Sequence, residues 1–174
     1  MRILCISAQK PDSTGSGVYL AETVASLAAA GHQVAVIAGI DKDDSPQLAP
    51  GVEFLPVRFR TPELPFPVCG MSDQMPYEAT RYRDMTPEMC NQFKHAFDQA
   101  IREACEEEFP DVVLCHHLYL VTALARERVR GVPVVAVCHS TDLRQLRSHA
   151  LERDRIVRAV RRLDAVFALH AEQA

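Results

Sequence analysis

Residues 1–39 have the sequence MRILCISAQKPDSTGSGVYLAETVASLAAAGHQVAVIAG, which contains a strand pattern on each side of a helix pattern. Residues 3–6 form a continuous apolar run, as a strand does when both faces of a parallel sheet are covered. Residues 18–30 have apolar side chains at helical spacing, and Gly31 follows as the residue that ends the helix. Residues 34–38 are a second apolar run. The stretch predicts two buried strands joined by a glycine-containing loop and a helix.

The rest of the chain repeats this alternation. Further strands are expected at residues 52–59, 111–115, 133–137 and 165–169. Further helices are expected after Thr86 and before Pro110, over residues 118–130 and over residues 152–163. The proline-containing residues 60–85 are expected to form a long ordered loop. The alternation predicts an α/β fold with a Rossmann-like, doubly wound, mostly parallel sheet and helices on both faces.

Composition restricts the classes of function. The chain has 174 residues, of which 48% are hydrophobic and 24% are charged, as in one ordinary globular domain. Its net charge of -4 argues against nucleic-acid binding, because such domains are usually basic. No apolar run is long enough to span a bilayer, and the apolar stretch at the N-terminus is too short for a signal peptide. We therefore expect a cytoplasmic protein with no nucleic-acid partner.

The cysteine pattern favours free thiols. No two cysteines form a C-x-x-C pair, and four lie inside apolar strand-like or helix-like stretches. Cys115 and His116 are consecutive, as are Cys138 and His139, so within a strand their side chains would point to opposite faces and could not easily share one metal ion. We expect no disulfide, no metal ion and no cofactor.

Ligands of a doubly wound sheet bind at the carboxyl ends of its strands. After the first strand come Gly15, Ser16 and Gly17, which lead into a helix. Glycines let backbone N–H groups approach an anion, and the helix N-terminus favours negative charge. The dinucleotide fingerprint would require Gly or Ala at position 20, where this chain has Leu20. The loop is expected to contact a phosphate or a sugar, with a purely structural turn as the alternative.

Histidines follow two other strands. His116 and His117 come after residues 111–115, and His139, Thr141 and Asp142 come after residues 133–137. A histidine can donate or accept a hydrogen bond and can change protonation near neutral pH. We expect His116 at the edge of the sheet, outside the core, and His117 pointing away from the site. The alternative for each histidine is a ring satisfied by the local backbone.

Seven arginines lie between Leu143 and Leu163. Five of them are on the predicted helix, opposite its apolar side, and are expected to be a solvated face. Arg144 and Arg147 follow Asp142 directly, so they are candidates for holding an anionic group.

At this point the sequence resembles the N-terminal half of a GT-B glycosyltransferase of the large retaining family 4. Residues 1–39 are similar to the family's first strand, glycine-rich loop, long helix and GHxV second strand. DVVLCHH (residues 111–117) resembles the family's strand ending in His-x-His, with Leu114 at the first histidine and His116 at the second. VPVVAVCHSTDLR (132–144) resembles the P-x-V-x-T-x-H-G-x-D segment, with Ser140 at the usual glycine. DAVFALHAEQA (164–174) resembles the strand before the S-x-x helix, with His170 near the usual serine.

The resemblance implies a two-domain enzyme that transfers a sugar from a nucleotide-sugar to an acceptor with retention. Residues 1–174 would be the acceptor-side domain, and the donor-binding C-terminal domain, which carries the family's E-x7-E motif, would be its partner. The leaving diphosphate would help to deprotonate the acceptor, so no protein base and no metal are implied. If the acceptor is a lipid, peripheral membrane contact is implied as well.

The resemblance also assigns roles to residues. His116 would hydrogen-bond the transferred sugar. Gly15, Ser16 and Gly17 would lie beside the acceptor or the donor diphosphate, and the substrate-binding set would be completed by His139, Thr141, Asp142 and Arg144. We expect the 174 residues to fold alone without transferring sugar. Two alternatives stay open: a sugar-nucleotide epimerase or hydrolase of the same fold, and a stand-alone binding domain without catalysis.

Overall fold

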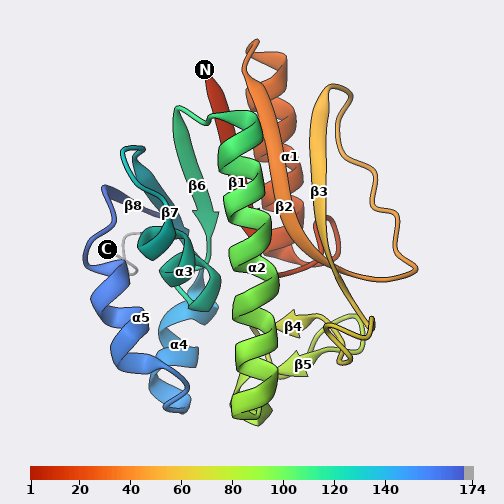
Figure 1. Ribbon diagram of the computed structural model, residues 1–174, viewed down its shortest axis with the longest axis vertical. Helices are drawn as coiled ribbons and strands as arrows, with labels where there is room; N and C mark the ends of the chain where they lie inside the picture. The colour runs from red at the N-terminus through yellow and green to blue at the C-terminus, as the bar shows by residue number, and fades with distance from the viewer. Residues whose placement is uncertain (171–174) are drawn as a thin grey trace.

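The apolar runs of the sequence form one parallel sheet (Figure 1). The computed structural model describes residues 1–170. The strand order in the sheet is β3-β2-β1-β6-β7-β8, and every neighbouring pair is parallel. The strands are β1 (Arg2–Ser7), β2 (Gln33–Asp41), β3 (Val52–Phe59), β6 (Val112–His116), β7 (Val134–Cys138) and β8 (Ala165–Ala168). The predicted fold class is confirmed.

The strand order reverses at β1, which pairs with β2 on one side and with β6 on the other. Ile6 lies beside Ile37 in one pair and beside Cys115 in the other. The connections that leave β1 and β6 therefore diverge at the carboxyl edge of the sheet. A reversal of this kind opens the crevice in which doubly wound folds bind ligands.

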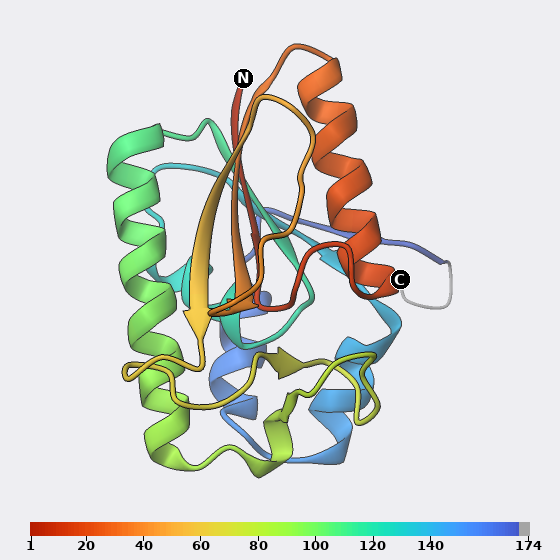
Figure 2. The ribbon, with the colours of Figure 1, turned by 90° about the vertical axis from the view of Figure 1, so that its right-hand side faces the viewer.

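Helices cover both faces of the sheet, as Figure 2 shows for α1 (Gly15–Ala29) and α2 (Pro87–Glu108). Leu20 and Val24 of α1 pack on Ile3 and Cys5 of β1. The alternate residues of β1, Leu4 and Ile6, face the other layer, which contains α2, α3 (Leu120–Arg128) and α5 (Arg153–Val160). The alternation along β1 thus explains why its whole run is apolar: both faces are buried.

The layer under α2 contains an aromatic cluster, which we define as Phe59, Phe66, Tyr82, Phe93, Phe97 and Tyr119. Ring centroids of neighbouring members lie 4.6–6.3 Å apart, within the range of favourable aromatic contact. Phe93, Phe97 and Ile101 recur every four residues on α2 and are all buried, so they form the apolar stripe with which the helix packs on the sheet. Thr86 caps this helix through its side chain, as expected from the Thr86-Pro87 pair.

Some elements differ from the predictions. Helix α1 begins at Gly15, and Val18, placed in the predicted apolar stripe, is 49% exposed. The helix α4 (Ser140–Ser148) is absent from the predictions, because its apolar residues are too few to mark a buried stripe. The predicted loop at 60–85 contains two short paired strands and a 3-10 turn: β4 (Cys69–Gly70), β5 (Thr80–Arg81) and η1 (Tyr82–Asp84).

The last four residues of the segment that resembles the S-x-x helix start, 171–174, lie outside the described residues. Within residues 1–170, every helix is too short or too polar to cross a bilayer. The six cysteines all lie in this range and are unpaired.

Candidate functional site

A cavity of about 360 Å³ lies at the carboxyl edge of the sheet, beside the point where the strand order reverses. It is bounded by the loop after β1, the first turn of α1, the end of β6, the first turn of α4 and the segment at 71–75. Its lining consists of Gln9, Thr14, Gly15, Ser16, Tyr19, Met71, Ser72, Gln74, Met75, His117, His139, Ser140, Thr141, Leu169 and His170. Among these residues there is no Lys, Arg, Asp or Glu. The site offers hydroxyls, amides, imidazoles and thioethers.

Asp142 holds the two strand ends together from behind the cavity. Its side chain is fully buried, and Oδ2 accepts hydrogen bonds from the backbone N–H of Leu118 at 2.8 Å and of His139 at 2.9 Å. Oδ1 lies 2.6 Å from Nδ1 of His117. One carboxylate therefore joins the end of β6, the end of β7 and the first turn of α4. The burial is tolerated because three donors surround it.

His116, His117 and His139 form a histidine cluster at this edge. The ring centroids of His116 and His139 are 5.6 Å apart, and those of His117 and His139 are 4.4 Å apart. Tyr19 of α1 contacts the rings of His116 and His139 at 5.9 and 5.8 Å. Within residues 1–170, four ring nitrogens of this cluster are buried without a hydrogen-bond partner: both of His116, and Nε2 of His117 and of His139.

Burial keeps the rings of His116 and His139 neutral. Burial, together with smaller contributions from the neighbouring His139 and His117, lowers the pKa of His116 to about 3. Burial likewise lowers the pKa of His139 to about 4. The protonated form of each ring would lose its hydration without gaining an adequate partner. In the neutral form, each unpartnered nitrogen can make a hydrogen bond with a ligand that reaches it.

The glycine-containing loop has two parts with different roles. A Cβ on Gly17 would lie 2.6 Å from the backbone oxygen of Lys10, so this position needs glycine for the close approach of the loop to α1. A Cβ on Gly15 would meet no atom within 4 Å, and Gly15 lines the cavity together with Ser16. Thr14 caps α1 by accepting from the N–H of Gly17 at 3.0 Å. Gly17 serves the packing of the turn, whereas Gly15 and Ser16 face the cavity.

The structure brings together only part of the predicted site. Gly15, Ser16, His139 and Thr141 line the cavity, and Oγ1 of Thr141 is another buried atom without a partner. The others of the set do not line it: Asp142 lies behind it, Gly17 is packed against the loop, and Arg144 is exposed on α4.

Two expectations about the histidines are wrong. His116 was expected outside the core, but its side chain is fully buried and covered by Tyr19, so its ring does not line the cavity. His117 was expected to point away, but it lines the cavity and contacts Asp142. The reason is a left-handed backbone at His117, with φ of 70°, which breaks the strand alternation immediately after β6.

Sequence reasoning missed several lining residues. Tyr19 is one turn into α1 and would have been found by continuing the Gly15–Gly17 face of the helix. Met71 and Met75 come from the segment expected to be a loop, and Gln145 of α4 anchors that segment by donating to the backbone oxygen of Met71 at 2.9 Å. Gln9 accepts a hydrogen bond from Ser16 at 3.3 Å. Only the tertiary fold could reveal these contacts.

The cysteines beside the site are poor nucleophiles. Burial raises the pKa of Cys115 to about 12 and that of Cys138 to about 11. A thiol that stays protonated at neutral pH attacks slowly. Within residues 1–170, no group of three or more His, Cys, Asp or Glu side chains is placed to hold a metal ion.

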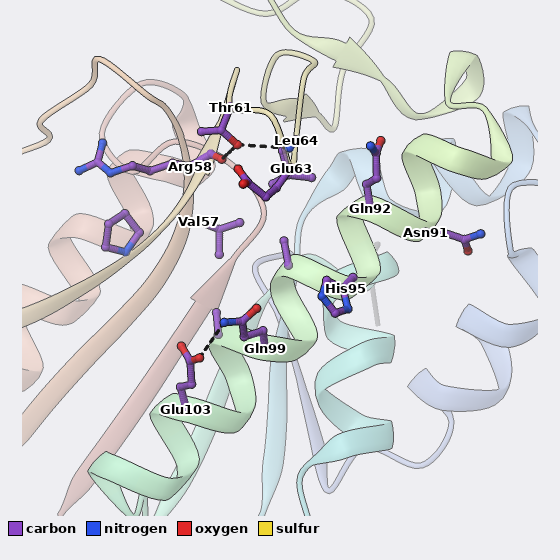
Figure 3. Close-up of a pocket in the computed structure, with 13 residues that line it drawn as sticks. Val57, Arg58, Thr61, Glu63, Leu64, Asn91, Gln92, His95, Gln99 and Glu103 are labelled. Carbon is purple, nitrogen blue, oxygen red and sulfur yellow. Dashed lines mark hydrogen bonds between the residues drawn. The ribbon is translucent and has the colours of Figure 1, made fainter.

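A second, larger concavity of about 670 Å³ lies between β3 and α2 (Figure 3). Its α2 wall presents Gln92, His95 and Gln99, and its other wall contains Val57 and Arg58 of β3. His95 is exposed to solvent, and the buried imidazole nitrogens that lack a partner within residues 1–170 lie at the histidine cluster instead. The cavity at the strand ends is therefore the better candidate for a binding site.

Comparison with known proteins shows the family to which the chain belongs. The sequence model of the glycosyl transferase 4-like domain matches residues 14–174. The chain belongs to this family. Curated protein sequences yield no match.

A solved structure shows a similar fold. The chain is similar to sucrose-phosphate synthase from Thermosynechococcus elongatus, with a TM-score of 0.62 and 14% identity over 95% of the chain. It also resembles the Streptomyces sp. SF2575 glycosyltransferase SsfS6, with a TM-score of 0.43 and 21% identity over 92% of the chain. The chain spans 41% of the first of these structures and 44% of the second. The glycosyl transferase 4-like domain described here thus matches less than half of either chain.

Proposed function

We propose that the intact protein transfers a sugar from a nucleotide-sugar donor to an acceptor with retention, and that this domain supplies the acceptor side of the cleft. The observation that carries the proposal is the uncharged cavity at the carboxyl edge of the sheet in a glycosyl transferase 4-like domain. A sugar presents hydroxyls and no charge, which matches a lining of hydroxyls, amides and imidazoles.

The donor diphosphate fits the helix N-termini at the same edge. Helices α1 and α4 both begin at the cavity, with Gly15, Ser16 and Ser140 in its lining. The first N–H groups of a helix and its dipole favour negative charge, so they can hold a phosphate without a metal ion. In this proposal the departing diphosphate takes part in deprotonating the acceptor, and a C-terminal domain completes the donor site. Arg144 and Arg147 remain candidates for steering the anionic donor. The reaction is expected in the cytoplasm.

An epimerase or hydrolase of the same fold finds less support. Such reactions need carboxyl groups that act as acid and base beside the ligand. The lining of the cavity contains none within the described residues, and Asp142 is engaged by three donors behind it.

The test is turnover of a panel of nucleotide-sugars by the intact protein, with the anomeric configuration of the product determined by NMR. Release of nucleoside diphosphate together with a retained glycoside supports the proposal, whereas an inverted glycoside or a free sugar contradicts it. Residues 1–174 alone are expected to unfold cooperatively yet to show no transfer, because in this proposal a C-terminal domain completes the donor site. Turnover by residues 1–174 alone would contradict the assignment of the acceptor side to this domain and of the donor site to a C-terminal domain.

A further inference from the structure

We propose that His117 recognises a hydroxyl of the bound sugar by accepting its hydrogen bond at Nε2, and that Asp142 is the positioning residue that makes Nε2 an acceptor. The inference rests on the proposed function for the nature of the ligand, since it concerns the same cavity. It differs from the expectation for His116, whose ring does not line the cavity.

The contacts of Asp142 determine which nitrogen of His117 carries the proton. A backbone N–H can only donate, so Oδ2 of Asp142 accepts from Leu118 and from His139. Oδ1 then faces Nδ1 of His117 at 2.6 Å. A carboxylate oxygen beside an unprotonated nitrogen would set two lone pairs against each other, so Nδ1 carries the proton and donates it to Oδ1. In the neutral ring, Nε2 is left with a lone pair.

The ring is held in position on several sides. The hydroxyl of Thr122 donates a hydrogen bond to the backbone oxygen of His117, which secures the left-handed residue with φ of 70°. The ring of His139 packs against it at 4.4 Å. Left-handed backbone in a non-glycine residue costs energy and persists where its surroundings hold it. Here those surroundings direct a side chain into the cavity.

Nε2 of His117 lacks a partner within the described residues, although its ring lines the cavity. A buried acceptor without a donor costs free energy, and a ligand that supplies an O–H removes that cost. An ether or carbonyl oxygen has no hydrogen to give and would place a lone pair against Nε2. The site should therefore distinguish a free hydroxyl from a deoxy or an O-methyl group at one position of the sugar.

The first test measures the tautomer and needs no activity. In the intact protein labelled with ¹⁵N-histidine, the ring of His117 should carry its proton on Nδ1 near neutral pH, and Asp142→Asn should alter that signature. His95 serves as the internal control, because its exposed ring has no such carboxylate partner. A proton on Nε2 of His117 in the wild-type protein would overturn the proposal, whether or not any sugar is transferred.

The second test separates acceptor chemistry from ring packing. His117→Phe keeps a planar ring without a nitrogen, and His117→Gln restores an acceptor oxygen, while His95→Phe is the matched control outside the cavity. We expect kcat/KM with the best nucleotide-sugar to fall roughly 10- to 100-fold in His117→Phe, to recover partly in His117→Gln and to stay unchanged in the control.

Sugar analogues identify the hydroxyl and its source. Monodeoxy forms of the donor sugar and of a sugar acceptor are compared in wild type and in His117→Phe. In the wild type, one monodeoxy analogue should lower kcat/KM by about the same factor as His117→Phe lowers it with the parent sugar. In His117→Phe, the same analogue should lower kcat/KM no further. If that analogue lowered kcat/KM by the same factor in the wild type and in His117→Phe, the proposal would be overturned. If the intact protein transfers no sugar, the proposed function fails, and the tautomer measurement still decides the role of Asp142.

Discussion

Two groups of buried rings lie in this domain, one under α2 and one at the carboxyl edge of the sheet. The aromatic cluster has centroid distances of 4.6–6.3 Å, and the histidine cluster with Tyr19 has distances of 4.4–5.9 Å. The packing is similar, but the chemistry is not. The aromatic cluster buries chiefly carbon, whereas the histidine cluster buries four nitrogens that lack partners in the described part of the chain.

The two clusters therefore differ in their effect on the stability of the folded state. Burying aromatic rings is among the largest favourable contributions to a core. Burying a nitrogen without a partner is unfavourable, so the histidine cluster makes the folded state less stable than an apolar cluster of the same shape would. The cluster lies beside a cavity, and in the proposal above a bound ligand satisfies the nitrogen of His117.

The largest expected effect is in the aromatic cluster. Phe93 is fully buried and contacts Phe59, Tyr82 and Phe97. Phe93→Ala should lower the free energy of unfolding by about 3–5 kcal/mol, because it removes buried area and leaves a cavity. Urea denaturation of wild type and variant measures the change. If Phe93→Ala lowered the free energy of unfolding by less than about 1 kcal/mol, the aromatic cluster would not be a main source of the stability of the domain.

The next effect concerns the support of the histidine cluster. Asp142→Ala leaves two backbone N–H groups and Nδ1 of His117 without their acceptor and should lower the free energy of unfolding by about 3 kcal/mol. Asp142→Asn keeps one acceptor oxygen and should lose less. Equal stability of the alanine variant and the wild type in urea would show that the carboxylate does not join the two strand ends.

The histidine cluster also predicts a dependence of stability on pH. The pKa of folded His116 is about 3, whereas an unfolded histidine titrates near its ordinary value of roughly 6.5. Between these values the unfolded chain binds a proton that the folded chain does not, so stability falls as the pH is lowered from 7. For one such ring the loss between pH 7 and pH 5 is about 2 kcal/mol.

The matched variant is His116→Leu, which removes the titrating ring and both unpartnered nitrogens. Its loss of stability between pH 7 and pH 5 should be smaller than that of the wild type by about 2 kcal/mol. His95→Leu, on the exposed face of α2, should keep the wild-type dependence. Identical pH profiles for His116→Leu and wild type would show that His116 titrates normally in the folded state.

The smallest effect is expected in the groove between β3 and α2. His95 is exposed there, and its replacement by alanine should change the free energy of unfolding by less than about 0.5 kcal/mol. Transfer activity of the intact protein should be unaffected as well. A large loss of activity would move the functional site from the strand ends to this groove.

Much of the fold follows from local patterns. The runs at β1, β2, β6 and β7 are apolar because both faces of these strands are covered or nearly so, and such runs are easy to recognise. Helix α2 is marked by Thr86-Pro87 and by a stripe four residues apart. Helix α4 is missed because its buried residues, Asp142 and Gln145, are polar and leave no apolar periodicity.

The sequence by itself determined the α/β class, the parallel alternation, the family resemblance and the strand ends that bound the cavity, because these depend on patterns within single elements. Only the tertiary structure decided which of His116 and His117 faces the cavity. Side chains alternate within a strand, but β6 ends at His116, and the next residue has a left-handed backbone held by Thr122 and Asp142 from elsewhere in the chain. No local sequence pattern predicts contacts between residues that lie apart in the sequence and meet only when the sheet forms.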